Sequence, residues 1–211
     1  MKVQASPPAA KRWGVRDLVY VAIFGALWGG LELSLGSYLH VLKVPFVGVV
    51  MASLGLLLAL VGRLFVPRRG AVWMMGVVTA LLKMLSLGGV VLNPMLGILA
   101  EATLAELALD ALGRPSRLAF AVAGGAGVLW VFFHPFVTQG LLAGRGLLTV
   151  YGWAIASGAR LLGFPPEAVG AIVAALLGLH LGAGAAAGLL AWQVGQAVQR
   201  RLGATAEDPA P

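Results

Sequence analysis

Three ionisable side chains stand inside long apolar stretches, where an uncompensated charge is costly. They are Glu32, Lys83 and Glu101. Groups of this kind normally face the interior of a helix bundle, where they pair with one another or contact a solute. Lys83 and Glu101 could form a structural ion pair or could both contact a ligand, and the sequence leaves both readings open.

Two series of residues at i, i+4 spacing place polar groups on a single helix face. They are Asn93, Gly97 and Glu101, and Trp130, His134 and Thr138. Residues four apart are neighbours on a helix surface, so each series forms one stripe. Gly97 leaves space between two polar groups, and Pro135 should loosen the backbone of the second helix.

The depth of these groups in their helices is set by the helical rise. Glu32 lies sixteen residues beyond Arg16, which corresponds to about 24 Å along a helix. The same rise places Lys83 and Glu101 in the same half of the bilayer, and Tyr38 and His40 follow as a lid on the first outer loop. The predicted solute-binding set is Glu32, Tyr38, His40, Lys83, Asn93, Glu101, Trp130 and His134. Polar groups within aromatic walls are typical of a pocket for a small planar heterocycle with a cationic or hydrogen-bond-donating part.

Structural readings compete with these assignments. His134 could be an interface histidine, and His180, among glycines and alanines, is better explained by helix packing. Glu106 and Asp110 are expected near a helix end, where Arg114 or Arg117 could neutralise them in solvent.

The composition defines the elements that must position these residues. Hydrophobic residues make up 60% of the 211-residue chain, charged residues 11%, and the mean hydropathy is +0.93. Such a chain has too little polar surface for a water-soluble fold. Because each crossing needs about 20 apolar residues, we expect an all-α, polytopic membrane protein with six transmembrane helices. The basic residues end apolar runs, which argues against a nucleic-acid partner.

The apolar runs give the predicted organisation. They cover approximately residues 18–39, 46–64, 71–92, 94–112, 118–142 and 168–198. We expect a basic tail at 1–16, a six-helix domain at 17–198 and a C-terminal tail at 199–211. Residues 143–166 form a long outer loop between the fifth and sixth helices. Its apolar part, 146–163, is predicted as an interfacial, re-entrant or spanning helix.

The basic residues orient the chain. With six crossings, one side of the membrane holds eleven of the fifteen Lys and Arg residues: Lys2, Lys11, Arg12, Arg16, Arg63, Arg68, Arg69, Arg114, Arg117, Arg200 and Arg201. Cytoplasmic loops carry such an excess, so both termini are predicted to be cytoplasmic, in the cell membrane.

Small residues mark one face of the first helix. Ala22, Ala26 and Gly30 follow a small-xxx-small pattern, which permits close approach of another helix. Glu32 lies about 120° away from Ala26 around the helix, so it can face the bundle while the alanine face is directed outward. This face is a candidate docking surface.

The span pattern and the Ala22-xxx-Ala26 motif resemble the substrate-binding S components of energy-coupling factor (ECF) transporters. The resemblance implies a subunit without enzymatic activity that captures a vitamin-like solute at its outer face. It also implies that the alanine face docks onto a transmembrane T component driven by separate ATPase subunits. The chain itself has no phosphate-binding P-loop, and neither a cofactor nor a metal is expected.

Two other classes fit part of the pattern. Buried Glu and Lys residues also suit a stand-alone channel or an ion-coupled secondary transporter. An intramembrane enzyme is the third alternative, although the sequence has no His-Glu-x-x-His pair and no Gly-x-Ser-x-Gly elbow.

Overall fold

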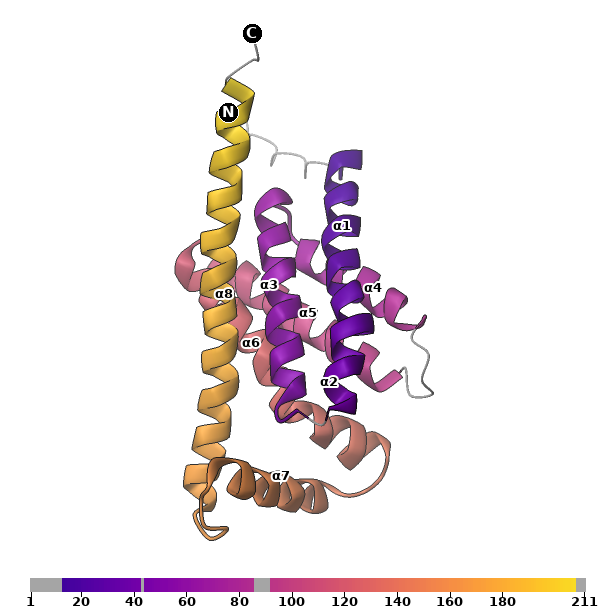
Figure 1. The fold of residues 1–211 in the computed structure, drawn as a ribbon, viewed down its shortest axis with the longest axis vertical. Helices are drawn as coiled ribbons and strands as arrows, with labels where there is room; N and C mark the ends of the chain where they lie inside the picture. The colour runs from indigo at the N-terminus through magenta and orange to yellow at the C-terminus, as the bar shows by residue number, and fades with distance from the viewer. Residues whose placement is uncertain (1–12, 43, 86–91, 208–211) are drawn as a thin grey trace, which may run out of the picture.

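The computed structural model describes residues 13–42, 44–85 and 92–207, and every regular element within these ranges is a helix. The predicted all-α class is therefore confirmed. The described elements, in order, are α1 (Val15–Leu31), η1 (Glu32–Gly36), α2 (Ser37–Val41), α3 (Val47–Phe65), α4 (Ala71–Lys83), α5 (Leu92–Leu112), α6 (Arg117–Pro135), η2 (Phe136–Leu142), α7 (Leu147–Leu162) and α8 (Val169–Glu207). Here η denotes a π-helical segment. Figure 1 shows these elements as a bundle of elongated helices.

Among the described residues, four helical stretches are long and apolar enough to cross a membrane: Val15–Leu39, Val47–Phe65, Arg117–Leu142 and Val169–Leu202. Many large apolar side chains on them are exposed, including Ile23, Val122 and Leu190. Several apolar helices with apolar outer faces suggest a membrane protein, as the composition predicts.

Two helices, α4 and α8, differ from the expected spans. The helix predicted over 71–92 ends at Lys83, and its 13 residues correspond to about 20 Å, less than the hydrocarbon core. The chain beyond it contains Ser86, Gly88 and Gly89, residue types of weak helix propensity. At the other end of the chain, α8 continues through Glu207, beyond the expected boundary at 198.

Glycines set how closely the helices pack. α8 packs most extensively on α6, where Gly184 lies against the backbone of Gly124 and Gly188 lies against that of Phe120. A side chain at either glycine of α8 would collide with backbone atoms. On the other side of the bundle, Gly25 of α1 lies against α4.

The two ends of the bundle have different character. The ion pair between Asp17 and Arg68 joins the start of α1 to the α3–α4 connection, and the start of α4 contacts the end of α5 through Glu106. We call this the basic end, defined by Arg16, Arg63, Arg68, Arg69, Arg114 and Arg117. In Figure 1 the start of α1 and the end of α8 both lie toward the top, at this end.

α7 occupies most of the long connection predicted between the fifth and sixth apolar runs. Figure 1 shows it lying across the bottom of the bundle, at the end opposite the basic end. It contacts η2 and α8, and its buried side includes Val150 and Ile155. Gly163, with φ of +73°, ends the helix in the left-handed conformation that glycine adopts without strain.

Candidate solute-binding site

Lys83, the last residue of α4, is buried and directed at α1. Its Nζ lies 3.3 Å from Oε2 of Glu32 and donates a 2.9 Å hydrogen bond to the Glu32 carbonyl oxygen. Of the two readings left open for Lys83 and Glu101, the ion pair between them is not formed, because Lys83 pairs with Glu32 instead. The reason is the packing order: the end of α4 meets α1, and both partners lie at the same depth along those helices.

Glu32 stands at the start of a π-helical turn. The α-helical hydrogen-bond pattern of α1 changes at this residue, and the wider turn runs through Gly36 before α2 begins. Such π turns inside longer helices are frequent at functional sites, because they redirect side chains. Gly36 lies directly beside the Glu32 carboxylate. Because glycine has no side chain, the Glu32 side chain has room to lie along its own helix toward Gly36.

A hydrogen-bonded chain of three side chains joins α5 to α6. The indole Nε1 of Trp130 donates to Nδ1 of His134 over 3.1 Å, and Nε2 of His134 lies 2.9 Å from Oδ1 of Asn93. Because an indole N–H can only donate, Nδ1 must accept. Nε2 then carries the proton and donates to Asn93, which fixes His134 as a neutral imidazole.

Glu101 lies across a glycine from His134. A side chain at Gly97 would come within 3.2 Å of Cε1 of His134 and 3.8 Å of Oε1 of Glu101, so Gly97 is the gap between the two groups. Glu101 is only 8% exposed and makes no hydrogen bond or ion pair with another residue of the described ranges. Its carboxyl group is also close enough to Glu32 for the two to interact electrostatically.

Four helices thus contribute to one set of buried or half-buried polar groups, which we call the polar cluster. Its members are Glu32, Lys83, Asn93, Glu101, Trp130 and His134. Lys83 is satisfied by Glu32 and His134 by its two neighbours, whereas Glu101 has unused acceptor capacity. The chemistry available at Glu101 is hydrogen bonding to a donor or cation, on the other side of Gly97 from His134.

Other residues of the predicted set lie elsewhere. Tyr38 is 62% exposed on α2, and the side chain of His40 lies outside the described part of the structure. Thr138, which belongs to the second stripe but not to the predicted set, is buried, and its hydroxyl donates to the carbonyl oxygen of His134 in its own helix. His180 likewise bonds to the Leu176 carbonyl through Nδ1 and stacks edge-on against Phe132, a packing role as expected.

The π-helix η2 follows Pro135 directly. Proline has no N–H to donate and clashes with the preceding turn, so the α-helical pattern changes at Phe136. The expected loosening at Pro135 is therefore observed. Both π-helical segments of the described chain adjoin polar-cluster residues, Glu32 in one case and His134 in the other.

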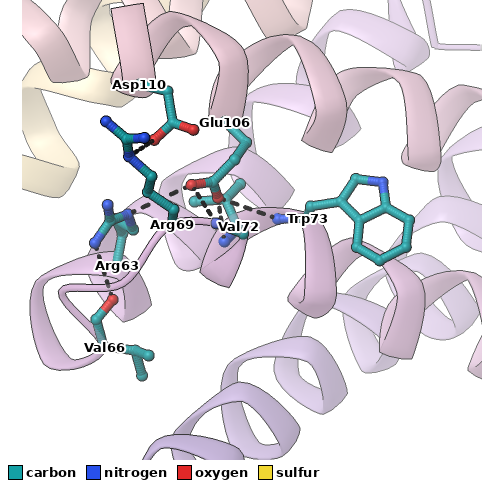
Figure 2. Close-up of polar contacts among 8 residues, drawn as sticks. Arg63, Val66, Arg69, Val72, Trp73, Glu106 and Asp110 are labelled. Atoms are coloured by element: carbon teal, nitrogen blue, oxygen red, sulfur yellow. Dashed lines mark hydrogen bonds and ion pairs between the residues drawn. The ribbon is translucent and has the colours of Figure 1, made fainter. Parts of the chain in front are cut away.

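Sequence reasoning missed a second polar network, at the basic end (Figure 2). Glu106 is buried, and its two carboxylate oxygens accept hydrogen bonds from Gly70 N at 2.8 Å and Val72 N at 2.7 Å. Arg63 approaches the same carboxylate to 3.8 Å. The expectation that Glu106 meets Arg114 or Arg117 in solvent is wrong. α4 begins after Gly70, which offers no capping side chain, so its free N–H groups need an acceptor from another helix.

The candidate docking face is exposed. Ala22, Ala26 and Gly30 lie on the outer side of α1, and nothing is within 4 Å of the position that a Gly30 side chain would take. Gly25 and Gly29 point the other way, against Val78 and Leu82 of α4. The outward direction predicted for the alanine face, away from Glu32, is what the fold provides.

Within the described ranges, no group of three or more His, Cys, Asp or Glu side chains is placed to hold a metal ion. Comparison of the chain with family models, curated proteins and solved structures finds no match.

Proposed function

We propose that this chain is a membrane-embedded solute-binding subunit of an uptake transporter of the energy-coupling factor type. The observation that carries the proposal is the polar cluster, in which Glu101 has unused acceptor capacity beside the Trp130–His134–Asn93 chain. A buried carboxylate without a protein partner is costly, and a cationic or hydrogen-bond-donating solute would offset that cost.

The solute in this proposal is a small heterocycle with a ring nitrogen or amino group directed at Glu101. The indole of Trp130, which is hydrogen-bonded to His134, provides an aromatic surface for the ring of the solute. The Glu32–Lys83 pair neutralises one of the two acidic groups, so a single positive charge on the solute is sufficient. Six crossings, with the polar cluster in the outer half of the bilayer and both termini in the cytoplasm, complete the arrangement.

The docking part of the proposal rests on α1. Ala22 and Ala26 are neighbours on its outer face, and both side chains are small. A helix of a T component can therefore approach this face closely. ATPase subunits bound to that T component would supply the energy.

Complex formation tests this proposal. Bulky leucines at Ala22 and Ala26 should abolish co-purification with the T component and ATPases while leaving solute binding within about twofold. The matched control is leucine at Ala174 and Gly178, which lie four residues apart, as Ala22 and Ala26 do, on the exposed side of α8. Equal complex formation by both double variants would refute docking through α1.

The same unpaired Glu101 favours a second candidate, an ion-coupled secondary transporter, because a buried carboxyl group can carry a proton across a membrane. In that case the chain alone, reconstituted in vesicles, would accumulate solute when an ion gradient is imposed. The transporter-subunit proposal predicts no such accumulation without the T component and ATP.

A further inference from the structure

A cavity of about 270 Å³ opens at the basic end, far from the polar cluster. It lies between the end of α3, the α3–α4 connection, the end of α5 and the start of α6. Three arginines and one aspartate provide its charged lining: Arg63, Arg69, Arg114 and Asp110. Its apolar walls include Leu109 and Phe120.

The positive charge of this cavity is only partly neutralised. Asp110 pairs with Arg69 at 3.6 Å. Glu106 faces Arg63 at 3.8 Å, but its oxygens are engaged by the amides of α4, and Nε of the largely buried Arg63 has no hydrogen-bond partner in the described structure. Arg114 forms no ion pair or side-chain hydrogen bond with any described residue.

The start of α6 adds to this potential. Ser116 caps the helix by accepting from Ala119 N, and Phe120 in the next turn lines the cavity. The positive end of the helix dipole therefore lies at the cavity, where it favours an anion. The cavity is smaller than the roughly 300–1,000 Å³ typical of sites for drug-sized ligands, so a compact anionic group fits it better.

The surroundings indicate where that anion comes from. Leu112 and Leu118, on either side of the Gly113–Arg117 connection, are 42% and 65% exposed. Apolar surface beside an arginine cavity at a membrane face matches a lipid, with a charged head and apolar chains. Arginine also binds phosphate oxygens in a bidentate manner, and basic pockets between helices on the cytoplasmic side bind anionic head groups.

We propose that this cavity binds the phosphate of an anionic phospholipid head group, with the acyl chains lying against Leu112 and Leu118. The site is independent of the polar cluster and of the proposed function. It places a specific lipid at the junction of α3, α4, α5 and α6, where bound lipid would tie together the connections at the basic end.

Native mass spectrometry of the full-length protein, titrated with phosphatidylglycerol and separately with phosphatidylcholine, tests the proposal. Phosphatidylglycerol should bind at least about tenfold more tightly, because its head group keeps a net negative charge for the arginines, whereas the choline cation of phosphatidylcholine offsets the charge of the phosphate. Arg114→Gln should remove that preference. Arg117→Gln, an equal loss of charge three residues away but outside the cavity lining, should retain it. Asp110→Asn should strengthen phosphatidylglycerol binding, because it removes the negative charge of the cavity.

A separate titration with inorganic phosphate distinguishes binding of a lipid from binding of a free anion. Binding of phosphate without a preference for phosphatidylglycerol would overturn the lipid assignment. Equal losses in the Arg114 and Arg117 variants would overturn it as well, because they would show general surface attraction rather than a site.

Discussion

Lys83 Nζ contacts two oxygens of a single residue, the carboxylate and the backbone carbonyl of Glu32. Both side chains are buried, so each charge depends on the other for compensation. Removing one partner from a buried pair leaves an uncompensated charge, which typically costs about 3–5 kcal/mol. The pair therefore holds the end of α4 against the π-helical turn of α1.

A double-mutant cycle measures this pairing. Lys83→Met should lower the free energy of unfolding in detergent by about 3 kcal/mol, and adding Glu32→Gln should cost much less than it does alone. The matched cycle of Lys83→Met with Glu101→Gln should show a clearly smaller coupling energy, because Glu101 does not contact Lys83 and shares only Glu32 with it. Coupling of Lys83 to Glu101 instead of Glu32 would contradict the observed pair.

Glu106 performs the task of a capping residue from a neighbouring helix. Each of its two oxygens accepts from a different amide at the start of α4. Glutamine has a single acceptor oxygen, so Glu106→Gln should leave one buried N–H unpaired and cost about 1–3 kcal/mol. Faster hydrogen exchange at Val72 would localise the effect.

Asp110→Asn is the control for that variant, four residues later on α5. Its ion pair is with Arg69, whose side chain is 81% exposed, so the loss should stay below about 1 kcal/mol. Similar losses for both variants would show that Glu106 does not cap α4.

At the scale of elements, the α6–α8 contact depends on glycines that allow backbone-to-backbone packing. A methyl group at Gly188 would lie 2.6 Å from the carbonyl carbon of Phe120, closer than real contacts allow. Gly182, on the same helix, has nothing within 4 Å of that position. The two glycines share a helix and differ in what they face.

Gly188→Ala should destabilise the bundle by about 1–3 kcal/mol, because α6 and α8 must move apart. Gly182→Ala should be neutral or stabilising by up to about 1 kcal/mol, since alanine has the better helix propensity. Thermal unfolding of the two variants checks the difference. If Gly182→Ala lost as much stability as Gly188→Ala, close packing of α6 on α8 at Gly188 would be refuted.

The elements also show what could be predicted from the sequence. Hydrophobic runs and Pro and Gly punctuation gave the starts of α3, α4 and α6 to within about one residue. Periodicity gave the faces: Ala22 and Ala26 outward, and Asn93, Gly97 and Glu101 on one stripe. Both follow from helical geometry, which is local.

Which helix packs against which could not be predicted from helical periodicity. Periodicity shows that Lys83 faces inward but not whether α1 or α5 lies opposite, so the sequence offered Glu101 as a possible partner where the structure has Glu32. Glu106 was misjudged for a related reason. Glu106 is buried because it caps the start of α4, where it accepts from Val72 N, 34 residues earlier in the sequence. No local sequence pattern reveals a contact over that separation.

At the scale of the whole molecule, the chain divides into a basic end and an opposite end crossed by α7 (Figure 1). The positive-inside rule predicts that the basic end faces the cytoplasm. The polar cluster and α7 would then lie toward the outer face, where Arg145 stacks on Trp153 near the start of α7, as arginine and tryptophan do at membrane interfaces.

Cysteine labelling tests this orientation, and the natural chain contains no cysteine that would interfere. Gly152→Cys, at an exposed position of α7, should react with a membrane-impermeant maleimide in intact cells. Thr205→Cys, near the end of α8, should react only after the membrane is permeabilised. The reverse pattern would invert the topology, and labelling of both in intact cells would exclude an even number of crossings with both termini inside.

The most direct measurement of the central claim is the affinity of the solute that co-purifies with the protein, identified and titrated by native mass spectrometry. Wild-type protein and Asp110→Asn should bind it equally. Glu101→Gln and His134→Ala, shown to be folded, should bind it about tenfold or more weakly, because each loses a hydrogen bond in the polar cluster. Unchanged affinity in both variants, or wild-type protein that retains no solute, would contradict the account.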